Sequence, residues 1–294
     1  MIGLCLVTLA TATGCLPMWI DTLTREPTVR AHPQLQEKLA SIKTVAIMPP
    51  GVTVERLGAW LALSGIPRAV MEEETAAARR TLTTAIEKEL ERHAGVVFTP
   101  FPAPSTGLDA SRDPAAVRLT AELEDTQALF ETVNTSIILR TYKHRDLRFV
   151  EKLTNFDYSL GPDVQQFAKL ANTDALLFTA GIDLRLSGGA KTLRVLANLP
   201  LYFLAGLARQ PLSSGGLPLV GPTTLSVALV DASTGTLLWY NVVGDPSSSG
   251  GHSLTNPYSV TNLMAQLLED FPLGTRPPRN EYDGGAWPSP PGPH

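Results

Sequence analysis

Residues 223–242, which read TTLSVALVDASTGTLLWYNV, decide the fold of this chain. Two runs rich in aliphatic and aromatic residues, Thr223 to Asp231 and Thr236 to Val242, flank the short polar segment 232–235. Such runs are typical of β-strands. Ser, Thr and Gly between them fit a tight turn, because glycine relieves backbone strain there. The sequence therefore predicts a β-hairpin.

Three other apolar runs indicate further strands. Val45 to Ile47 reads as a buried strand that Pro49 and Pro50 end, since proline cannot donate to a ladder. Residues 173–181 form an apolar run too short for a helix, and the alternation that follows to Ser187 continues it. We interpret this run as the central strand, and residues 96–98 as a further short one.

Four segments carry the spacing of amphipathic helices. Within 72–93, Leu82, Ile86 and Leu90 recur every four residues and define one apolar face. A second helix is predicted from Asp113-Pro114 to about residue 140, because Asp can cap free N–H groups and Pro suits the first turn. Two further helices are predicted, one starting at residue 161 and the other covering 258–271. We therefore predict an α+β (α/β-like) fold in which helices flank a mixed central sheet.

The N-terminal segment indicates where the protein is expected to reside. Residues 2–10 are apolar and uncharged, and Ala12, Thr13 and Gly14 lead into Cys15. This layout is typical of a secretory signal. It resembles a bacterial lipoprotein lipobox, with Ala12 where that family usually has Leu, and the resemblance implies that Cys15 is lipidated. The alternative is a short N-terminal strand or helix that happens to hold a cysteine.

These patterns predict a domain organisation. Residues 1–14 are the expected lipoprotein signal peptide, and 15–40 a tether that includes a short helix. A single globular domain is expected over 41–271, with a helical insertion at about 104–160 and an apolar insertion at about 190–221. The stretch 272–294 is expected to be a Pro-rich disordered tail.

Composition narrows the classes of function. With 44% apolar and 18% charged residues the chain suits a globular core, and a net charge of −4 argues against a nucleic-acid partner. The two cysteines are Cys5 and Cys15. Because Cys5 would be removed with the signal, the sequence predicts neither a disulfide nor a cysteine-based metal site.

No motif predicts catalysis. The five histidines never recur at a metal-binding spacing, and no glycine-rich phosphate loop or Gly-x-Ser-x-Gly elbow is found. The consecutive carboxylates Glu72 to Glu74 suit a solvated helix start, and His93 suits a helix end. Trp239 could stack on a glycan, but we expect it to fill the core. We therefore predict no catalytic residue, no metal and no cofactor.

Three strings carry a resemblance to known families. Residues 45–49 (VAIMP) resemble the opening strand of curli-secretion-channel lipoproteins and of the TolB N-terminal-like fold. Residues 173–177 (TDALL) resemble a later strand of these families, and 226–239 resemble their hairpin. With the lipobox, the match covers roughly 41–98 and 161–271. It implies a periplasm-facing lipoprotein, comparable also with envelope lipoproteins of the GNA type.

The expected function follows from this resemblance. We predict a non-catalytic lipoprotein anchored through Cys15, which binds other envelope proteins in a secretion, surface or cell-wall assembly. Leu201, Tyr202, Phe203 and Leu204 form a candidate partner contact, because an exposed apolar patch marks such sites; packing as an internal helix is the alternative. Outer-membrane placement is expected, since Leu16 stands where an inner-membrane retention signal has Asp. The alternatives are a homo-oligomeric, curli-like export channel and a cell-wall hydrolase.

Overall fold

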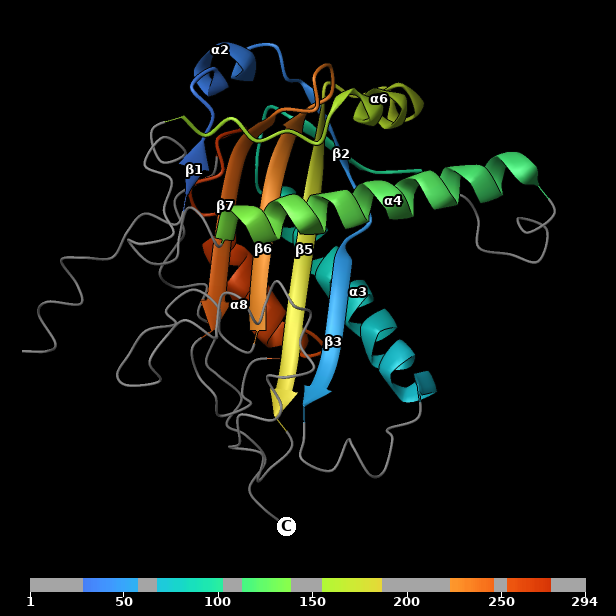
Figure 1. The fold of residues 1–294 in the computed structure, drawn as a ribbon. Coiled ribbons are helices and arrows are strands. Elements are labelled where there is room, and N and C mark those ends of the chain that lie inside the picture. The colour runs from blue at the N-terminus through green and yellow to red at the C-terminus, as the bar shows by residue number, and fades with distance from the viewer. Residues whose placement is uncertain are drawn as a thin grey trace, which may run out of the picture.

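A computed structural model describes residues 29–57, 68–102, 113–138, 155–186, 223–245 and 253–275. Within these residues the chain forms one mixed seven-stranded sheet with helices on both faces (Figure 1). This arrangement confirms the α+β class predicted from the sequence. The predicted signal peptide and the apolar insertion at 190–221 lie outside the described residues.

The sheet combines a parallel half with an antiparallel half. Its order is β1-β7-β6-β5-β2-β4, and β3 also pairs with β5. β2, β3 and β5 run parallel, as do β2 and β4, whereas β6 is antiparallel to both β5 and β7. The strands are β1 (Arg30–Ala31), β2 (Thr44–Ile47), β3 (Gly51–Leu57), β4 (Val97–Pro100), β5 (Ala175–Leu186), β6 (Thr223–Asp231) and β7 (Leu237–Asp245). The predicted hairpin is confirmed as β6 and β7.

The double proline interrupts one strand without ending the sheet. β2 ends at Ile47, opposite Leu177 of β5, as the prolines predicted. The chain then resumes as β3 at Gly51, opposite Ala180 of the same neighbour. β5 is long enough to pair with both pieces in succession, so β3 prolongs the sheet in a place where the sequence predicted no strand.

Two of the helices, α4 and α8, begin at capping residues. Asp113 caps α4, because its side chain accepts a 2.9 Å hydrogen bond from the Ala115 N–H and Pro114 occupies the first turn. Asn256 caps α8 in the same way. The helices are α2 (Leu35–Leu39), α3 (Arg68–Leu90), α4 (Pro114–Ile137), α6 (Gln165–Ala171) and α8 (Pro257–Leu267), with a 3-10 turn η3 (Pro162–Val164) before α6.

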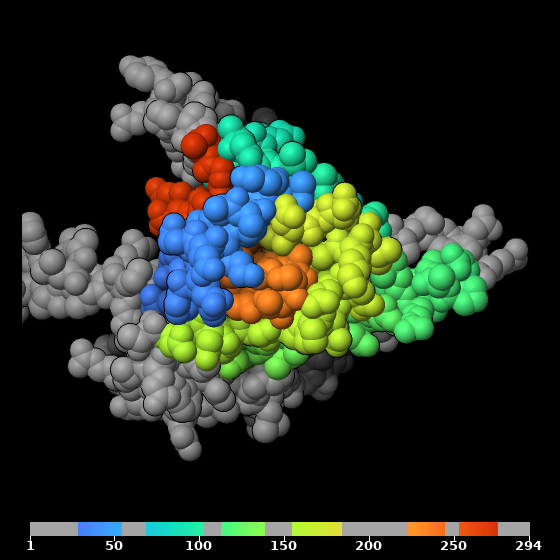
Figure 2. All heavy atoms as spheres, turned by 90° about the horizontal axis from the view of Figure 1, so that it is seen from above, coloured from blue at the N-terminus to red at the C-terminus, as the bar shows by residue number. Residues whose placement is uncertain are grey.

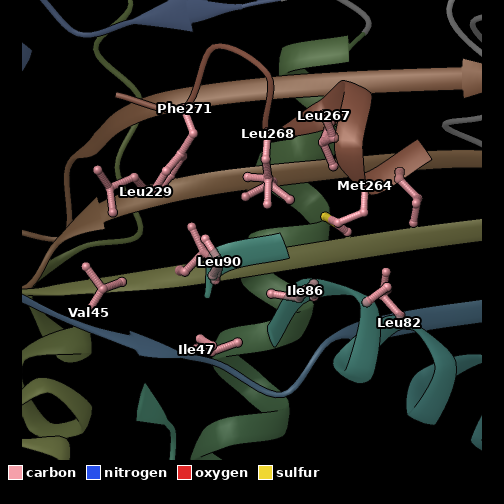
Figure 3. Close-up of a cluster of buried hydrophobic side chains, with 14 of the residues drawn as sticks. Val45, Ile47, Leu82, Ile86, Leu90, Leu229, Met264, Leu267, Leu268 and Phe271 are labelled. Carbon is pink, nitrogen blue, oxygen red and sulfur yellow. The ribbon is translucent and has the colours of Figure 1, made fainter. Parts of the chain in front are cut away.

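An aliphatic layer fills the space between α3, α8 and one face of the sheet. Leu82, Ile86 and Leu90 of α3 are at most 1% exposed and meet the side chains of α8 and of the strands (Figure 3). The four-residue spacing read from the sequence thus marks the buried face of α3. α3 itself extends further toward the N-terminus than predicted and ends at Leu90 rather than His93.

A more aromatic layer lies on the opposite face, beneath α4 and α6. The rings of Phe130 and Phe178 are 5.3 Å apart, and the buried Tyr240 hydroxyl donates a 2.6 Å hydrogen bond to Asn134 of α4. α4 crosses the sheet in Figure 1 and supplies part of this core. The helix predicted as an insertion is therefore the cover of one sheet face.

The described domain extends beyond the predicted 41–271 at both ends. Arg30 of β1 pairs with Tyr240, and Leu35 of α2 is 6% exposed, so part of the predicted tether packs on the sheet. At the other end, Thr275 forms a β-bridge with Ala94. Both additions pair backbone polar groups with the rest of the domain in hydrogen bonds, which explains why they belong to the folded body.

Candidate functional site

A hollow of about 520 Å³ opens at the end of the sheet where β2 and β5 begin and β6 turns into β7. In Figure 2, which views the molecule from above, the β6–β7 turn lies between the segment containing α2 and the segment containing α6. This volume falls within the range of small-ligand pockets. The lining residues are Lys38, Ser41, Ile42, Gln165, Ala168, Lys169, Asn172, Thr173, Asp174, Asp231, Ala232, Ser233 and Leu238.

Asp174 joins the beginnings of β2 and β5. Asn172 ends α6 in the left-handed conformation, with φ of 51°, and turns the chain toward β5. The Asp174 carboxylate then accepts hydrogen bonds from the Lys43 N–H at 2.9 Å and from the N–H and hydroxyl of Thr44, each at 3.0 Å. Burial raises the pKa of this carboxyl, but these donors and the Lys43 charge outweigh it and hold the pKa below its ordinary value.

Asp231 joins the β6–β7 turn to α2. The residue is 6% exposed, and its Oδ1 accepts hydrogen bonds from the N–H and hydroxyl of Ser233 at 2.9 and 2.8 Å. Its Oδ2 lies 2.8 Å from the Nζ of Lys38. Burial raises the pKa of the Asp231 carboxyl, but Lys38 and Ser233 outweigh it and lower the pKa overall. The same carboxylate raises the pKa of Lys38.

Two polar groups of the hollow are left without such a partner. Lys169 is exposed on the last turn of α6 and forms no ion pair with the described residues. The Thr173 hydroxyl oxygen is buried and has no hydrogen-bond partner in the described part of the chain. A buried hydroxyl without a partner is costly, and because this oxygen is shielded from solvent it is not open to a ligand in the hollow.

The turn below the hollow is held by a close approach of two backbone segments. Gly235 has φ of 75°, and its carbonyl accepts a 2.8 Å hydrogen bond from the Leu160 N–H. A Cβ at Gly235 would overlap the backbone of Gly161. Glycine at 235 therefore serves both the positive φ and the contact, whereas the sequence indicated only a turn-forming role.

The residues singled out from the sequence fall in different places. Cys15 and the candidate contact Leu201 to Leu204 lie outside the described residues. Trp239 is 1% exposed and packs edge-on against Phe271, with ring centroids 5.1 Å apart, as expected for a core residue. The glycan-stacking alternative is thereby overturned, because the indole is not accessible.

His93 has a different role from the helix end that we predicted. Its ring Nδ1 lies 3.1 Å from the Leu273 carbonyl oxygen, and the ring meets Phe98 and Phe271 edge-on. It therefore holds the segment before Thr275 against the start of β4. The difference arises because α3 stops at Leu90, which leaves His93 in the following turn.

Sequence reasoning missed most of the hollow. Lys38 and Lys169 belong to no motif, and nothing in the sequence signals that they converge. Thr173 and Asp174 are exceptions, since the Thr-Asp step before a strand was noted in residues 173–177. The physical basis of this step is the three hydrogen bonds that the Asp174 carboxylate accepts from the start of β2.

The described residues contain neither a metal-binding cluster nor a membrane-spanning helix. Among them, no group of three or more His, Cys, Asp or Glu side chains could hold a metal ion. No described helix combines the length and the hydropathy required to cross a bilayer.

Comparisons with known proteins add little. No protein-family model and no curated protein matches the chain. Among solved structures, the PelC dodecamer from Paraburkholderia phytofirmans is 14% identical, with a TM-score of 0.29 over 82% of this chain and 94% of that chain. A single-substitution variant of that dodecamer is 13% identical, with a TM-score of 0.28 and the same coverage. At these TM-scores the likeness carries no argument about fold or function.

Proposed function

We propose that this protein is a non-catalytic, lipid-anchored component of a bacterial cell envelope that binds other proteins. The observation that carries the proposal is the N-terminal pattern, in which an apolar run and three small residues precede Cys15. Acylation of the Cys15 thiol would place the folded body beside an outer or inner envelope membrane. Bacterial lipoproteins of the kind that this pattern resembles carry several acyl chains, which is enough for stable anchoring.

The described body is compatible with such an anchor. The first described strand begins at Arg30, so residues 16–29 separate Cys15 from the sheet. At about 3.3–3.6 Å per extended residue, this linker spans at most about 50 Å. The anchor would therefore confine the domain to within about that distance of a membrane.

The chemistry of the hollow supports binding over catalysis. Both of its carboxylates are engaged by donors that hold the chain together, and their pKa values are lowered rather than raised. General acid catalysis near neutral pH instead needs a carboxyl whose pKa is raised. Binding another protein requires only a rigid surface whose shape fits the partner, and no activated carboxyl.

Metabolic labelling with a clickable fatty acid tests the anchor. Wild-type protein expressed in a bacterium should take up label, and Cys15→Ala should lose it. Cys5→Ala is the matched control and should keep the label, because Cys5 lies within the predicted signal. Label that persists in Cys15→Ala, or that requires Cys5, would contradict the proposal.

In-cell crosslinking tests the binding role separately. The labelled wild-type protein should form discrete adducts with envelope proteins, and Cys15→Ala should lose them because it is no longer held at the membrane. A strictly uncomplexed protein in the intact envelope would remove the binding role and leave the anchor standing.

A further inference from the structure

We propose that the hollow between α2, α6 and the β6–β7 turn binds a short peptide by its two free ends, the ammonium and the carboxylate. The ligand class is therefore a small zwitterion. Three observations support the proposal: the balance of charge in the hollow, the two opposite charges that stay open to a ligand, and the fixed walls. The proposal goes beyond the protein-binding function above and does not depend on a lipid anchor.

The charged side chains that line the hollow cancel in sum. They are Lys38, Lys169, Asp174 and Asp231. Lys38 and Asp231 compensate each other, with 2.8 Å between Nζ and Oδ2. Lys169 and Asp174 remain, and both are exposed. A ligand with a single charge would match one of these two groups and leave the other unmatched, whereas a zwitterion matches both.

Asp174 keeps one carboxylate oxygen for a ligand. Its hydrogen bonds from the Lys43 N–H and from the N–H and hydroxyl of Thr44 all reach Oδ2. Oδ1 accepts no hydrogen bond, and Lys43 forms no ion pair with this group, within the described part of the chain. Burial raises the pKa of the Asp174 carboxyl, but the donors and the Lys43 charge outweigh it, so the group is ionised at neutral pH. Oδ1 is therefore an open acceptor for an ammonium.

Lys169 offers the opposite charge at the same corner of the fold. It lies on the last turn of α6 and forms no ion pair with the described residues. Asn172 then turns the chain, with φ of 51°, so that Asp174 follows directly before β5 and lines the same hollow. A carboxylate carries one negative charge, whereas a phosphate monoester carries about 1.5 to 2. The single free ammonium of Lys169 therefore matches a carboxylate better than a phosphate.

The walls of the hollow are fixed before any ligand arrives. The amide nitrogen of Gln165 donates to the Ser233 carbonyl and holds α6 against the β6–β7 turn. Asp231 joins the same turn to α2 through Lys38. Figure 2 views the face on which these three segments meet. Preformed walls lower the ordering cost of binding, and a volume of about 520 Å³ suits a ligand of the size of a short peptide.

Methyl NMR on the full chain tests the proposal, with diglycine as the probe. In protein labelled at alanine methyls, Ala168 and Ala232 line the hollow and should shift saturably, whereas Ala78 and Ala85 in the α3 layer should not. We expect a dissociation constant on the order of millimolar, because exposed ion pairs contribute little. The absence of a saturable shift at about 100 mM diglycine would overturn the proposal.

Two blocked analogues of diglycine test the need for both charges. N-acetyl-diglycine keeps only the carboxylate, and diglycinamide keeps only the ammonium. Each should bind about threefold more weakly than diglycine, as expected for the loss of one exposed ion pair. If either analogue binds as tightly as diglycine, the hollow is a site for a single charge and the proposal is wrong.

One protein variant assigns the carboxylate end of the ligand. Lys169→Gln should weaken diglycine and N-acetyl-diglycine about threefold and leave diglycinamide unchanged. Lys88→Gln, at an exposed lysine of α3, is the control and should change none of the three affinities. Equal effects of the two variants, or equal weakening of all three ligands by Lys169→Gln, would overturn the proposal. These results involve neither acylation of Cys15 nor a protein partner, so a failure here leaves the proposed function standing.

Discussion

The aliphatic layer beneath α3 and α8 and the hollow at the end of the sheet hold the chain together in different ways. In the layer, side chains such as Leu82 and Ile86 are fully buried and stabilise by loss of apolar surface to water. Around the hollow, Asp174 and Asp231 bind backbone groups and a lysine. The comparison teaches that the layer stabilises the fold through burial, whereas the polar end is held by directional hydrogen bonds that position a surface.

The largest expected effect comes from the aliphatic layer beneath α3 and α8. Trp239→Ala should lower the free energy of unfolding by about 3–5 kcal/mol, because a fully buried indole leaves a large cavity. Urea unfolding followed by circular dichroism measures the loss. Leu129→Ala is the control, since Leu129 is 42% exposed on α4 and should cost about 0.5 kcal/mol. Equal losses would contradict the assignment of Trp239 to the core.

The next effect tests the turn below the hollow. Gly235→Ala should lower the free energy of unfolding by at least about 2 kcal/mol, because it adds an overlap with Gly161 to the strain of a positive φ. Gly95→Ala is the matched variant. Gly95 has φ of 93° but nothing within 4 Å of an added Cβ. We therefore expect Gly95→Ala to lower the free energy of unfolding by about 1 kcal/mol. Similar losses in thermal unfolding would show that the contact with Gly161 is not tight.

A smaller effect separates the two lysines of the hollow. Lys38→Met should lower stability by about 1 kcal/mol, a value reduced because the Lys38 side chain is 34% exposed. It removes the counterion of a buried carboxylate. Lys169→Met should leave stability within about 0.5 kcal/mol, because Lys169 has no such partner among the described residues. If denaturant unfolding shows a larger loss of stability in Lys169→Met than in Lys38→Met, the distinction between the two lysines is wrong.

The smallest effect concerns the stability of the protein at low pH. Asp231 has a lowered pKa in the folded protein, so its contribution is present above the unfolded value of about 3.9 and is lost as pH falls through the folded value. Wild-type stability should therefore fall on acidification below about pH 4. Asp231→Asn should show a shallower fall in denaturant midpoint over that window. An unchanged slope would mean that Asp231 titrates alike in both states.

Elements with local signals could be predicted from the sequence. The hairpin follows from two apolar runs around Gly235, and the start of α4 follows from Asp113 and Pro114, because turn and cap chemistry acts within a few residues. β3 was missed because Pro49 and Pro50 indicate an end, while the reason for resumption is the length of β5, far along the chain.

The hollow could not be predicted for the same physical reason. The hydrogen bonds from Lys43 and Thr44 to Asp174 join residues about 130 positions apart, and Lys38 meets Asp231 across a still longer separation. Each of these side chains is ordinary in its own segment. Only the order of strands in the sheet brings them to one end, and single-segment patterns do not encode that order.

One pair of unfolding measurements tests the central division of the molecule most directly. Trp239→Ala in the aliphatic layer should lower the free energy of unfolding by about 3–5 kcal/mol, whereas Lys38→Met at the hollow should lower it by about 1 kcal/mol. Equal losses, or a larger loss in Lys38→Met, would contradict an apolar layer that stabilises the fold and a polar end that positions a surface.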